Sequence, residues 1–285
     1  MPARVVTQAP SPLTDAQAQE YTFEDNAAAL YRVLTLDGKE ADWITAPVAI
    51  EYSLTITHNG QELATLLCSP GEERHLALGF LASEGIITNA CEVTKVTFDT
   101  DHGFVWVEST STKPPVGDVF LKRCLTACCG RGRAGQCFAN DGDLVHTVKS
   151  GVRLSQQAIA HYSNTLDALS VTFRATGGVH GGALFKENKM LCFSQDMGRH
   201  NVLDKLYGYC LDHEIAMQDI ILSFSGRVST EVLLKANKMN IPVIVARGAP
   251  STQAIELAEK LHITIIGFAR EDRCNVYTHA ERICT

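Results

Sequence analysis

Four cysteines and two arginines share the stretch CLTACCGRGRAGQC, which runs from Cys124 to Cys137 without an acidic residue. The charges of Arg131 and Arg133 favour a cysteine thiolate over the neutral thiol. Gly130 and Gly132 leave a neighbouring sulfur exposed and allow close approach to a partner. A thiolate in such a loop can attack a sulfur donor and then carry the sulfur as a persulfide.

Two other interpretations of this loop stay open. A set of four thiolates can hold zinc, but zinc sites prefer C-x-x-C pairs, and the adjacent Cys128 and Cys129 fit one ion poorly. The cysteines can also be loop residues without chemistry, because free cysteine often behaves as a small hydrophobe. Cys68, Cys192 and Cys210 stand in apolar stretches and are expected to be buried in that way.

A glycine-rich stretch, TGGVHGGALF from Thr176 to Phe185, is the second candidate. Gly177 and Gly178 precede His180, and their exposed backbone N–H groups can hold an anion. A tight turn leading into a strand explains the same glycines, with His180 as a packing residue. The stretch alone does not decide between the two.

Three further motifs carry arginine where an expected strand ends. Helix N-termini bind anions, ligands of open α/β sheets lie beyond the carboxyl ends of strands, and arginine donates to phosphate in pairs. We therefore predict a polyanionic ligand such as a phosphate-bearing cofactor. The alternative is a capping Asp or Asn beside a solvated arginine. The motifs are SQDMGRHNVLDK (Ser194 to Lys205), SFSGRVSTE (Ser223 to Glu231) and GFAREDR (Gly267 to Arg273).

The elements that position these motifs divide the chain into three predicted parts. Residues 1–40 are expected to be a flexible tail, and residues 41–150 a smaller α+β domain that contains the cysteine loop 124–137. That domain starts with a hairpin around Asn59-Gly60 and a helix from Glu72 to Gly85. In residues 151–285, the apolar runs IILSF, IPVIVA and ITIIGFA alternate with amphipathic helices. This pattern predicts an α/β domain whose sheet is partly parallel and covered on both faces.

Composition bounds the function classes. The chain has 285 residues, 45% hydrophobic residues and a formal net charge of −7. It can bury a sizeable core, and its mild acidity argues against nucleic-acid binding. There is no apolar run of membrane-spanning length. The first residues lack the apolar segment of a secretory signal, so we expect a cytoplasmic protein, in which clustered cysteines indicate metal binding or reactive chemistry.

Taken together and in order, these motifs resemble the FdhD family of formate dehydrogenase accessory sulfurtransferases. The resemblance extends from VAIEYSLTITHNG to YTHAERI and includes TGGVHGGALF, DMGRHNVLDK, SGRVSTE and IIGFAR. It implies a sulfur carrier that accepts persulfide sulfur from a cysteine desulfurase. The sulfur passes to the molybdenum or tungsten of bis(molybdopterin guanine dinucleotide), which then activates formate dehydrogenase.

The resemblance also implies a homodimer and a C-terminal three-layer α/β domain similar to the cytidine deaminase-like fold, without a permanent metal of its own. Cys129 stands at the family's persulfide position, although a shift by one residue would select Cys128. The family's frequent second cysteine is absent, and Gln195 stands where the family has an acidic residue. The implied cofactor-binding residues are Gly177, Gly178, His180, Arg199, His200, Asn201, Ser225, Gly226, Arg227, Phe268, Ala269, Arg270, Glu271, Asp272 and Arg273.

Two alternatives follow from the missing second thiol and the cysteine cluster. One is a non-catalytic chaperone that binds and delivers the molybdenum or tungsten cofactor. The other is a zinc-binding interaction protein that uses the cysteine loop. Persulfide loading separates the first from a sulfur carrier, and a zinc assay under reducing conditions tests the second.

Overall fold

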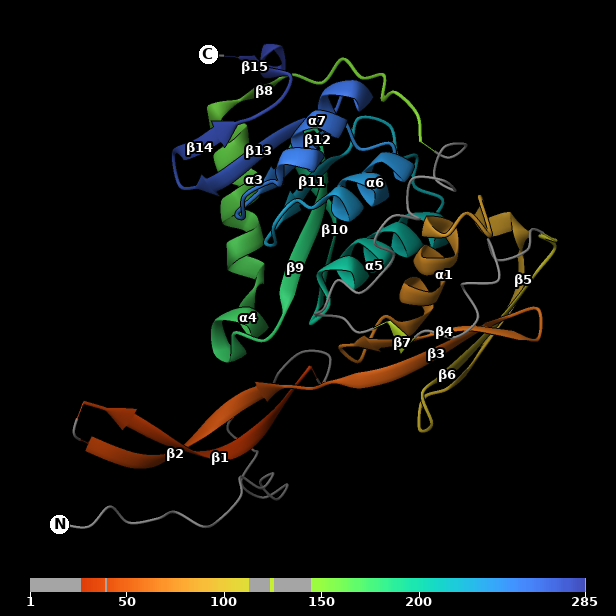
Figure 1. The fold of residues 1–285 in the computed structure, drawn as a ribbon, viewed down its shortest axis with the longest axis vertical. Helices are drawn as coiled ribbons and strands as arrows, with labels where there is room; N and C mark the ends of the chain where they lie inside the picture. Colours follow the sequence, from red (N-terminus) through yellow and green to blue (C-terminus); the bar gives the residue numbers. More distant parts are fainter. Residues whose placement is uncertain (1–26, 39, 113–123, 126–144, 285) are drawn as a thin grey trace.

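The computed structural model describes residues 27–38, 40–112, 124–125 and 145–284. Within these ranges the chain forms two main sheets, connected by helices, and a hairpin that extends away from both (Figure 1). The predicted α/β class is confirmed, while the cytidine deaminase-like similarity stays a prediction. None of the described helices is long and apolar enough to cross a membrane.

The first sheet comes from the N-terminal half, and its described strands follow the order β5-β6-β3-β4-β7. Asn59 and Gly60 join β3 to β4 with φ angles of 47° and 80°, the left-handed geometry that the Asn-Gly pair predicts. The predicted hairpin is therefore confirmed. The strands are β3 (Tyr52–His58), β4 (Gln61–Cys68), β5 (Val93–Asp99), β6 (Phe104–Ser109) and β7 (Cys124–Leu125).

The second sheet comes from the C-terminal half, and its described strands follow the order β10-β9-β11-β12-β13-β14. Strands β11, β12 and β13 are parallel, as the alternating apolar runs and helices predict. The other pairs are antiparallel. The strands are β9 (His180–Lys186), β10 (Lys189–Asp196), β11 (Ile221–Phe224), β12 (Val243–Ala246), β13 (Thr264–Arg270) and β14 (Arg273–Val276). A short parallel pair joins β8 (Leu154–Ser155) to β15 (Ile283–Cys284).

Helices cover both faces of the second sheet. Ile221 and Val243 pack with α3 on one face, whereas Leu222 and Ile244 join the core with α5, α6 and α7 on the other. Burial on both faces explains why these strands are continuous apolar runs rather than alternating ones. The helices are α1 (Glu73–Ser83), α3 (Gln156–Leu169), α4 (Val171–Thr176), α5 (Arg199–Asp212), α6 (Thr230–Lys238) and α7 (Thr252–Leu261).

The two halves share one apolar core through α1 and α5. Leu76 and Leu81 of α1 belong to the same buried cluster as Leu206 of α5. The two helix backbones approach closely at Gly79 and Gly208, where an added Cβ atom would lie 1.7 Å from the Asp204 carbonyl oxygen and 1.8 Å from that of His75. Helix α1, which belongs to the predicted domain 41–150, therefore positions α5, which carries the SQDMGRHNVLDK motif of the predicted domain 151–285.

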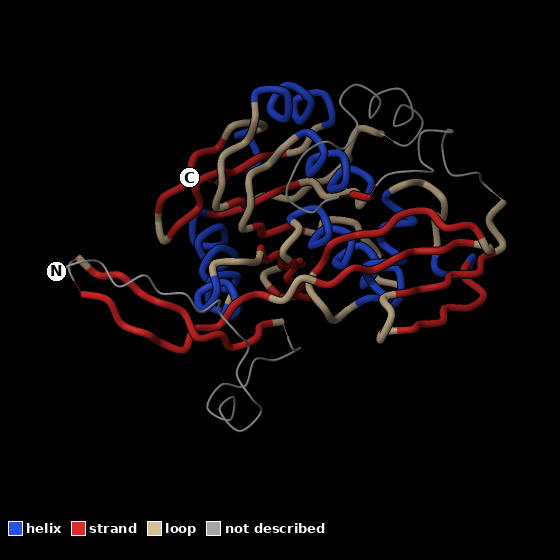
Figure 2. Tube along the Cα trace, turned by 60° about the horizontal axis from the view of Figure 1, so that its bottom comes forward, coloured by secondary structure: helices blue, strands red, loops and turns tan. Residues whose placement is uncertain are grey.

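The N-terminal segment corrects one prediction. Residues 1–40 were expected to be a flexible tail, but β1 (Ala28–Asp37) pairs along its full length with β2 (Glu40–Ala49), from Ala28 opposite Ala49 to Asp37 opposite Glu40. The physical reason is the turn at Asp37-Gly38, where Gly38 adopts φ 58° and closes a hairpin. This β1–β2 arm extends away from the remainder of the described chain (Figures 1 and 2).

Candidate functional site

Three of the predicted motifs meet at one edge of the second sheet. Because β9 is antiparallel to both neighbours, its first residue, His180, pairs with Asp196 at the end of β10. Gly182 pairs with Phe224 at the end of β11, and β12 ends beside β11 because the two are parallel. The strand-end motifs thus converge where ligands of open α/β sheets bind. We call this site the arginine–histidine edge, defined by His180, Arg199, His200 and Arg227.

The turn after β11 is fixed against the glycine-rich stretch. The backbone N–H of Gly181 donates to Ser225 Oγ at 2.9 Å, and the Ser225 N–H donates to the Gly181 carbonyl oxygen at 3.0 Å. A Cβ atom at Gly226 would lie 2.9 Å from the Phe224 ring and 3.6 Å from Nδ1 of His180. The absent side chain at Gly226 therefore lets this turn lie beside His180, while Arg227 is exposed.

Arg199 and His200 begin α5, but their side chains differ in how they are satisfied. Arg199 Nε is buried and has no hydrogen-bond partner among the described residues. His200 Nε2 lies 3.1 Å from Oε2 of Glu231, in the first turn of α6. Burial, followed by the charges of Lys235 and Arg199, nevertheless lowers the pKa of His200 to about 3.

His180 shares this electrostatic environment. Its pKa is lowered by burial and by the charge of Arg199, against a smaller opposing effect of Asp196. Both imidazoles are therefore neutral at pH 7, and the fixed positive charge comes from the guanidinium groups. Neutral imidazole can donate and accept hydrogen bonds, so the arginine–histidine edge can bind an anion with several oxygens.

A buried ion pair connects α5 to the end of β10 and so supports the arginine–histidine edge. Lys205 Nζ lies 2.9 Å from Oδ2 of Asp196, and their side chains are 1% and 0% exposed. Asp196 also accepts hydrogen bonds from the backbone of Ser69 and Gly198 and from the Asn201 amide. Asn201 also donates to the Leu67 carbonyl oxygen at 2.9 Å. Its amide nitrogen therefore connects the start of α5 to β4 and to Asp196 and does not face a ligand.

The local backbone explains why glycine occupies both positions before Val179 and His180. Gly177 ends α4 in a left-handed conformation with φ 65°, which glycine adopts without strain. Gly178 passes the end of β2 so closely that an added Cβ atom would lie 2.7 Å from the Cβ atom of Ala49. Both are exposed beside His180, so their backbone stays accessible.

The last predicted motif divides between two places. The Phe268 N–H donates to the Gly248 carbonyl oxygen at 3.4 Å, so this residue lies at the turn that follows β12. Its φ of 54° is unusual for a bulky residue, and its side chain is 46% exposed. A non-glycine residue held in this conformation, with an exposed ring, is the kind of strain that clusters at ligand sites.

The rest of that motif lies along α3. The Ala269 carbonyl oxygen accepts a hydrogen bond from Ser163 at 2.6 Å, and that of Asp272 accepts one from Gln156 at 2.6 Å. Arg270, Glu271 and Arg273 line a shallow pocket with the first turns of α3. Within one chain the structure therefore does not bring residues 270–273 to the arginine–histidine edge.

Two charged residues near this edge were not predicted. Lys205 is buried inside α5, and Arg247 follows β12 and forms an ion pair with Asp167 of α3 at 2.5 Å. The strand-end pattern that selected Arg199 and Arg227 also fits Arg247, which directly follows IPVIVA. A lysine within VLDKLYGYCL gives no comparable signal, because its partner is Asp196 of β10 rather than a residue of the same helix.

The predicted sulfur-carrying residues, Cys128 and Cys129, lie outside the described residues. Cys124 and Leu125 are described as β7, whose backbone continues the first sheet beside Thr65 and Leu66. Cys68, Cys192 and Cys210 are buried, as predicted. Burial raises the pKa of Cys68 to about 12, which keeps it as an unreactive thiol.

Comparison with known proteins gives consistent results over most of the chain. The model of the FdhD/NarQ family matches residues 49–284. The chain is 44% identical over 236 residues to the sulfur carrier protein FdhD of Geobacillus kaustophilus, covering 83% of this chain and 89% of that protein. It is 39% identical over 259 residues to the protein of the same name from Bacillus subtilis, covering 91% and 98%.

A solved structure shares the fold. The crystal structure of a putative formate dehydrogenase accessory protein from Desulfotalea psychrophila superposes with a TM-score of 0.75. The alignment covers 90% of this chain and 100% of that one at 20% sequence identity. This similarity extends the match to the three-dimensional arrangement of the elements.

Proposed function

The chain belongs to the FdhD/NarQ family, and from this premise we propose that it is a sulfur carrier required for formate dehydrogenase activity. The observation that supports the proposal is the arginine–histidine edge, where the glycine-rich stretch lies together with the two strand-end motifs that carry Arg199 and Arg227. We further propose that the protein works in the cytoplasm as a homodimer. A cysteine desulfurase is the proposed sulfur donor, and formate dehydrogenase receives the product.

In the proposed first step, the Cys129 thiolate attacks the terminal sulfur of the desulfurase persulfide. The bond between the two donor sulfurs breaks, the desulfurase cysteine leaves as a thiolate, and Cys129 becomes a persulfide without net oxidation. Cys128 takes this role if the register shifts by one residue. The protein is then a sulfurtransferase, because the sulfur leaves again in the second step.

In the second step, bis(molybdopterin guanine dinucleotide), with molybdenum or tungsten, is the bound substrate that receives the terminal sulfur as sulfide. The S–S bond of the Cys129 persulfide breaks, Cys129 returns to the thiolate, and a thiol reductant supplies the two electrons. The Nε of Arg199, which has no hydrogen-bond partner in the described part of the chain, and the neutral ring of His180 offer hydrogen-bond donors to its phosphates. The exposed ring of Phe268 offers a stacking surface for a base. Residues 270–273 lie along α3 from this edge, and we assign them to a distant part of the same large ligand.

Activation of formate dehydrogenase in cells that lack their own carrier tests the proposal. Cys129→Ala is expected to abolish activation, and Cys128→Ala is expected to retain it. The reverse result assigns the sulfur to Cys128. If both single variants and the double variant activate the enzyme fully, the chain delivers the cofactor as a chaperone without carrying sulfur.

A further inference from the structure

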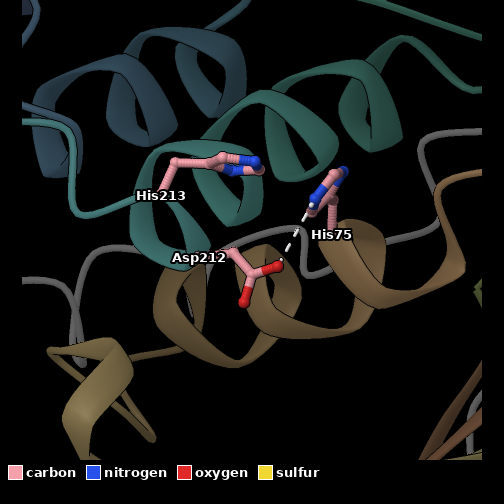
Figure 3. Close-up of side chains that lie close together, drawn as sticks. All are labelled: His75, Asp212 and His213. Atoms are coloured by element: carbon pink, nitrogen blue, oxygen red, sulfur yellow. Dashed lines mark ion pairs between the residues drawn. The ribbon is translucent and has the colours of Figure 1, made fainter.

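At the end of the α1–α5 contact, three side chains from the two helices turn toward one another (Figure 3). His75, Asp212 and His213 each offer one ligand atom, and these atoms lie within 4.8 Å of one another. We propose that they form a binding site for a divalent transition-metal ion, with Zn²⁺ as the fitting ion. Such a site is separate from the proposed sulfur transfer and does not rest on it.

The hydrogen bond of His213 selects its free nitrogen. Nδ1 of His213 lies 3.0 Å from the Tyr209 carbonyl oxygen. A carbonyl oxygen only accepts, so Nδ1 carries the hydrogen, and in the neutral ring Nε2 keeps the lone pair. The Tyr209 ring stacks on the imidazole at 4.0 Å and fixes its plane. A metal-ligating histidine commonly has this type of support behind it.

His75 has a carboxylate on the side away from the cluster. Nε2 of His75 lies 3.7 Å from Oδ2 of Asp212, while Nδ1 lies 3.7 Å from Oε1 of Glu72. Nδ1 is buried and makes no hydrogen bond to any residue that the structure describes. Glu72 is itself held by Ser194 Oγ at 2.8 Å. A small shift of the ring toward Glu72 would produce the carboxylate–histidine–metal arrangement that orients ligands in zinc sites.

Asp212 is held in place by Arg74. The Arg74 guanidinium donates to both carboxylate oxygens at 2.8 to 3.0 Å. A carboxylate has about four lone-pair sites, so Oδ2 retains acceptor capacity for a cation. Arg74 contributes one positive charge against the two negative charges of Asp212 and Glu72, so the local charge still favours a cation.

The ligand types decide the class of metal. Two imidazole nitrogens and one carboxylate oxygen suit zinc and its neighbours, whereas calcium and magnesium prefer oxygen ligands alone. Three protein ligands leave a position for water. The cluster lies at the C-terminal end of α5, and Arg199 lies at its N-terminal end, about 20 Å away along the helix. A metal here would connect α1 to α5 and stabilise the contact between the two halves.

If these residues bind no metal, they form only a network of ion pairs and ring contacts. In that case His75 only lies between the carboxylates of Glu72 and Asp212, and His213 is only a stacking partner of Tyr209. The two interpretations differ in what replacement of His213 does. Its side chain is exposed, so His213→Ala is expected to fold normally.

The test is Zn²⁺ affinity of the full-length reduced protein, measured against a competing chelator. His213→Ala is expected to weaken binding at this site by more than about 100-fold, the upper end of what loss of a supporting residue costs. Glu72→Gln is expected to weaken it by about 10-fold. The matched control is His102→Ala, because His102 pairs with Asp99 at 2.9 Å but belongs to no group of three possible metal ligands among the described residues.

X-ray absorption of the zinc-loaded protein separates this site from zinc bound to cysteine. Zn–N and Zn–O distances are about 2.0–2.1 Å, whereas Zn–S distances are about 2.3 Å. The proposal expects nitrogen and oxygen neighbours that disappear in His213→Ala. It is overturned if zinc has only sulfur neighbours, if no zinc binds, or if His213→Ala binds as tightly as His102→Ala.

Discussion

At the scale of single residues, Arg199 combines a fixed charge with an unsatisfied donor. Its Nε is buried without a hydrogen-bond partner among the described residues, and an unsatisfied buried donor costs about 1–3 kcal/mol. The native fold tolerates that cost at the edge where an anionic ligand is proposed. An anion that accepts from Arg199 would offset it.

Arg199→Ala is expected to weaken binding of guanosine diphosphate, used as a probe of the proposed substrate, by about 10- to 100-fold. This range corresponds to the roughly 1.5–3 kcal/mol of a charge-assisted hydrogen bond. Isothermal titration calorimetry measures the affinity. Arg174→Ala is the control, because Arg174 is an exposed arginine whose guanidinium donates to carbonyl oxygens of α3. Equal loss in both variants would contradict a specific role of Arg199.

His200 gives a prediction for pH dependence. Its pKa of about 3 in the folded protein lies below the ordinary histidine value of 6.5. The unfolded chain therefore binds the additional proton between these values, and stability falls as the pH drops from 6.5 toward 3. His200→Gln is expected to reduce this slope by up to about 1.4 kcal/mol per pH unit. Urea unfolding at pH 7, 6, 5 and 4 measures it, and parallel slopes would contradict the pKa assignment.

At the scale of elements, α1 and α5 decide whether the site is assembled. Gly208→Ala is expected to destabilise the protein by about 1–3 kcal/mol or more, because its new methyl group would overlap the His75 carbonyl. Gly151→Ala is the matched control, since no atom of the described residues lies within 4 Å of its added Cβ. Urea unfolding compares the two. Equal stabilities would mean that α1 and α5 can separate without cost.

Local signals explain which elements could be predicted from the sequence. Asn59-Gly60 specified a hairpin, and the apolar runs that form β11, β12 and β13 indicated a sheet buried on both faces. The arm was missed because its turn signal, Asp37-Gly38, follows a segment that was interpreted as a tail. The strand AALYRVLTLD has several apolar residues, but they do not alternate regularly with polar ones, so it lacks the pattern that predicts a half-buried strand.

The contacts that support the site leave no signal in the local sequence, because they join residues far apart in the chain. His75 and Asp212 meet only because two helices from different halves pack together, and Ser69, which follows β4, meets Asp196 at the end of β10 across the same two halves. The strand-end arginines could be predicted, since parallel strands place their ends at one edge. Residues 270–273 resembled them in sequence, but the irregular pairing between Gly267 and Arg270 directs them along α3 instead.

At the scale of the whole molecule, the β1–β2 arm is the surface we assign to the proposed homodimer. A two-stranded hairpin is marginal alone, and this one exposes large apolar side chains, with Leu36 71% and Ile44 46% exposed. A second copy is the occupant that the expected homodimer provides. Deletion of residues 28–49 is expected to shift the mass measured by light scattering from dimer to monomer. A dimer that persists would place the interface elsewhere.

The central claim is that this chain carries sulfur, and intact-mass measurement after incubation with a cysteine desulfurase and cysteine tests it most directly. The account predicts a gain of about 32 Da, one sulfur atom, that maps to Cys129 and is removed by a reductant. The gain is expected to be absent in Cys129→Ala and present in Cys128→Ala. No gain, while the same desulfurase loads another acceptor, would contradict a sulfur carrier.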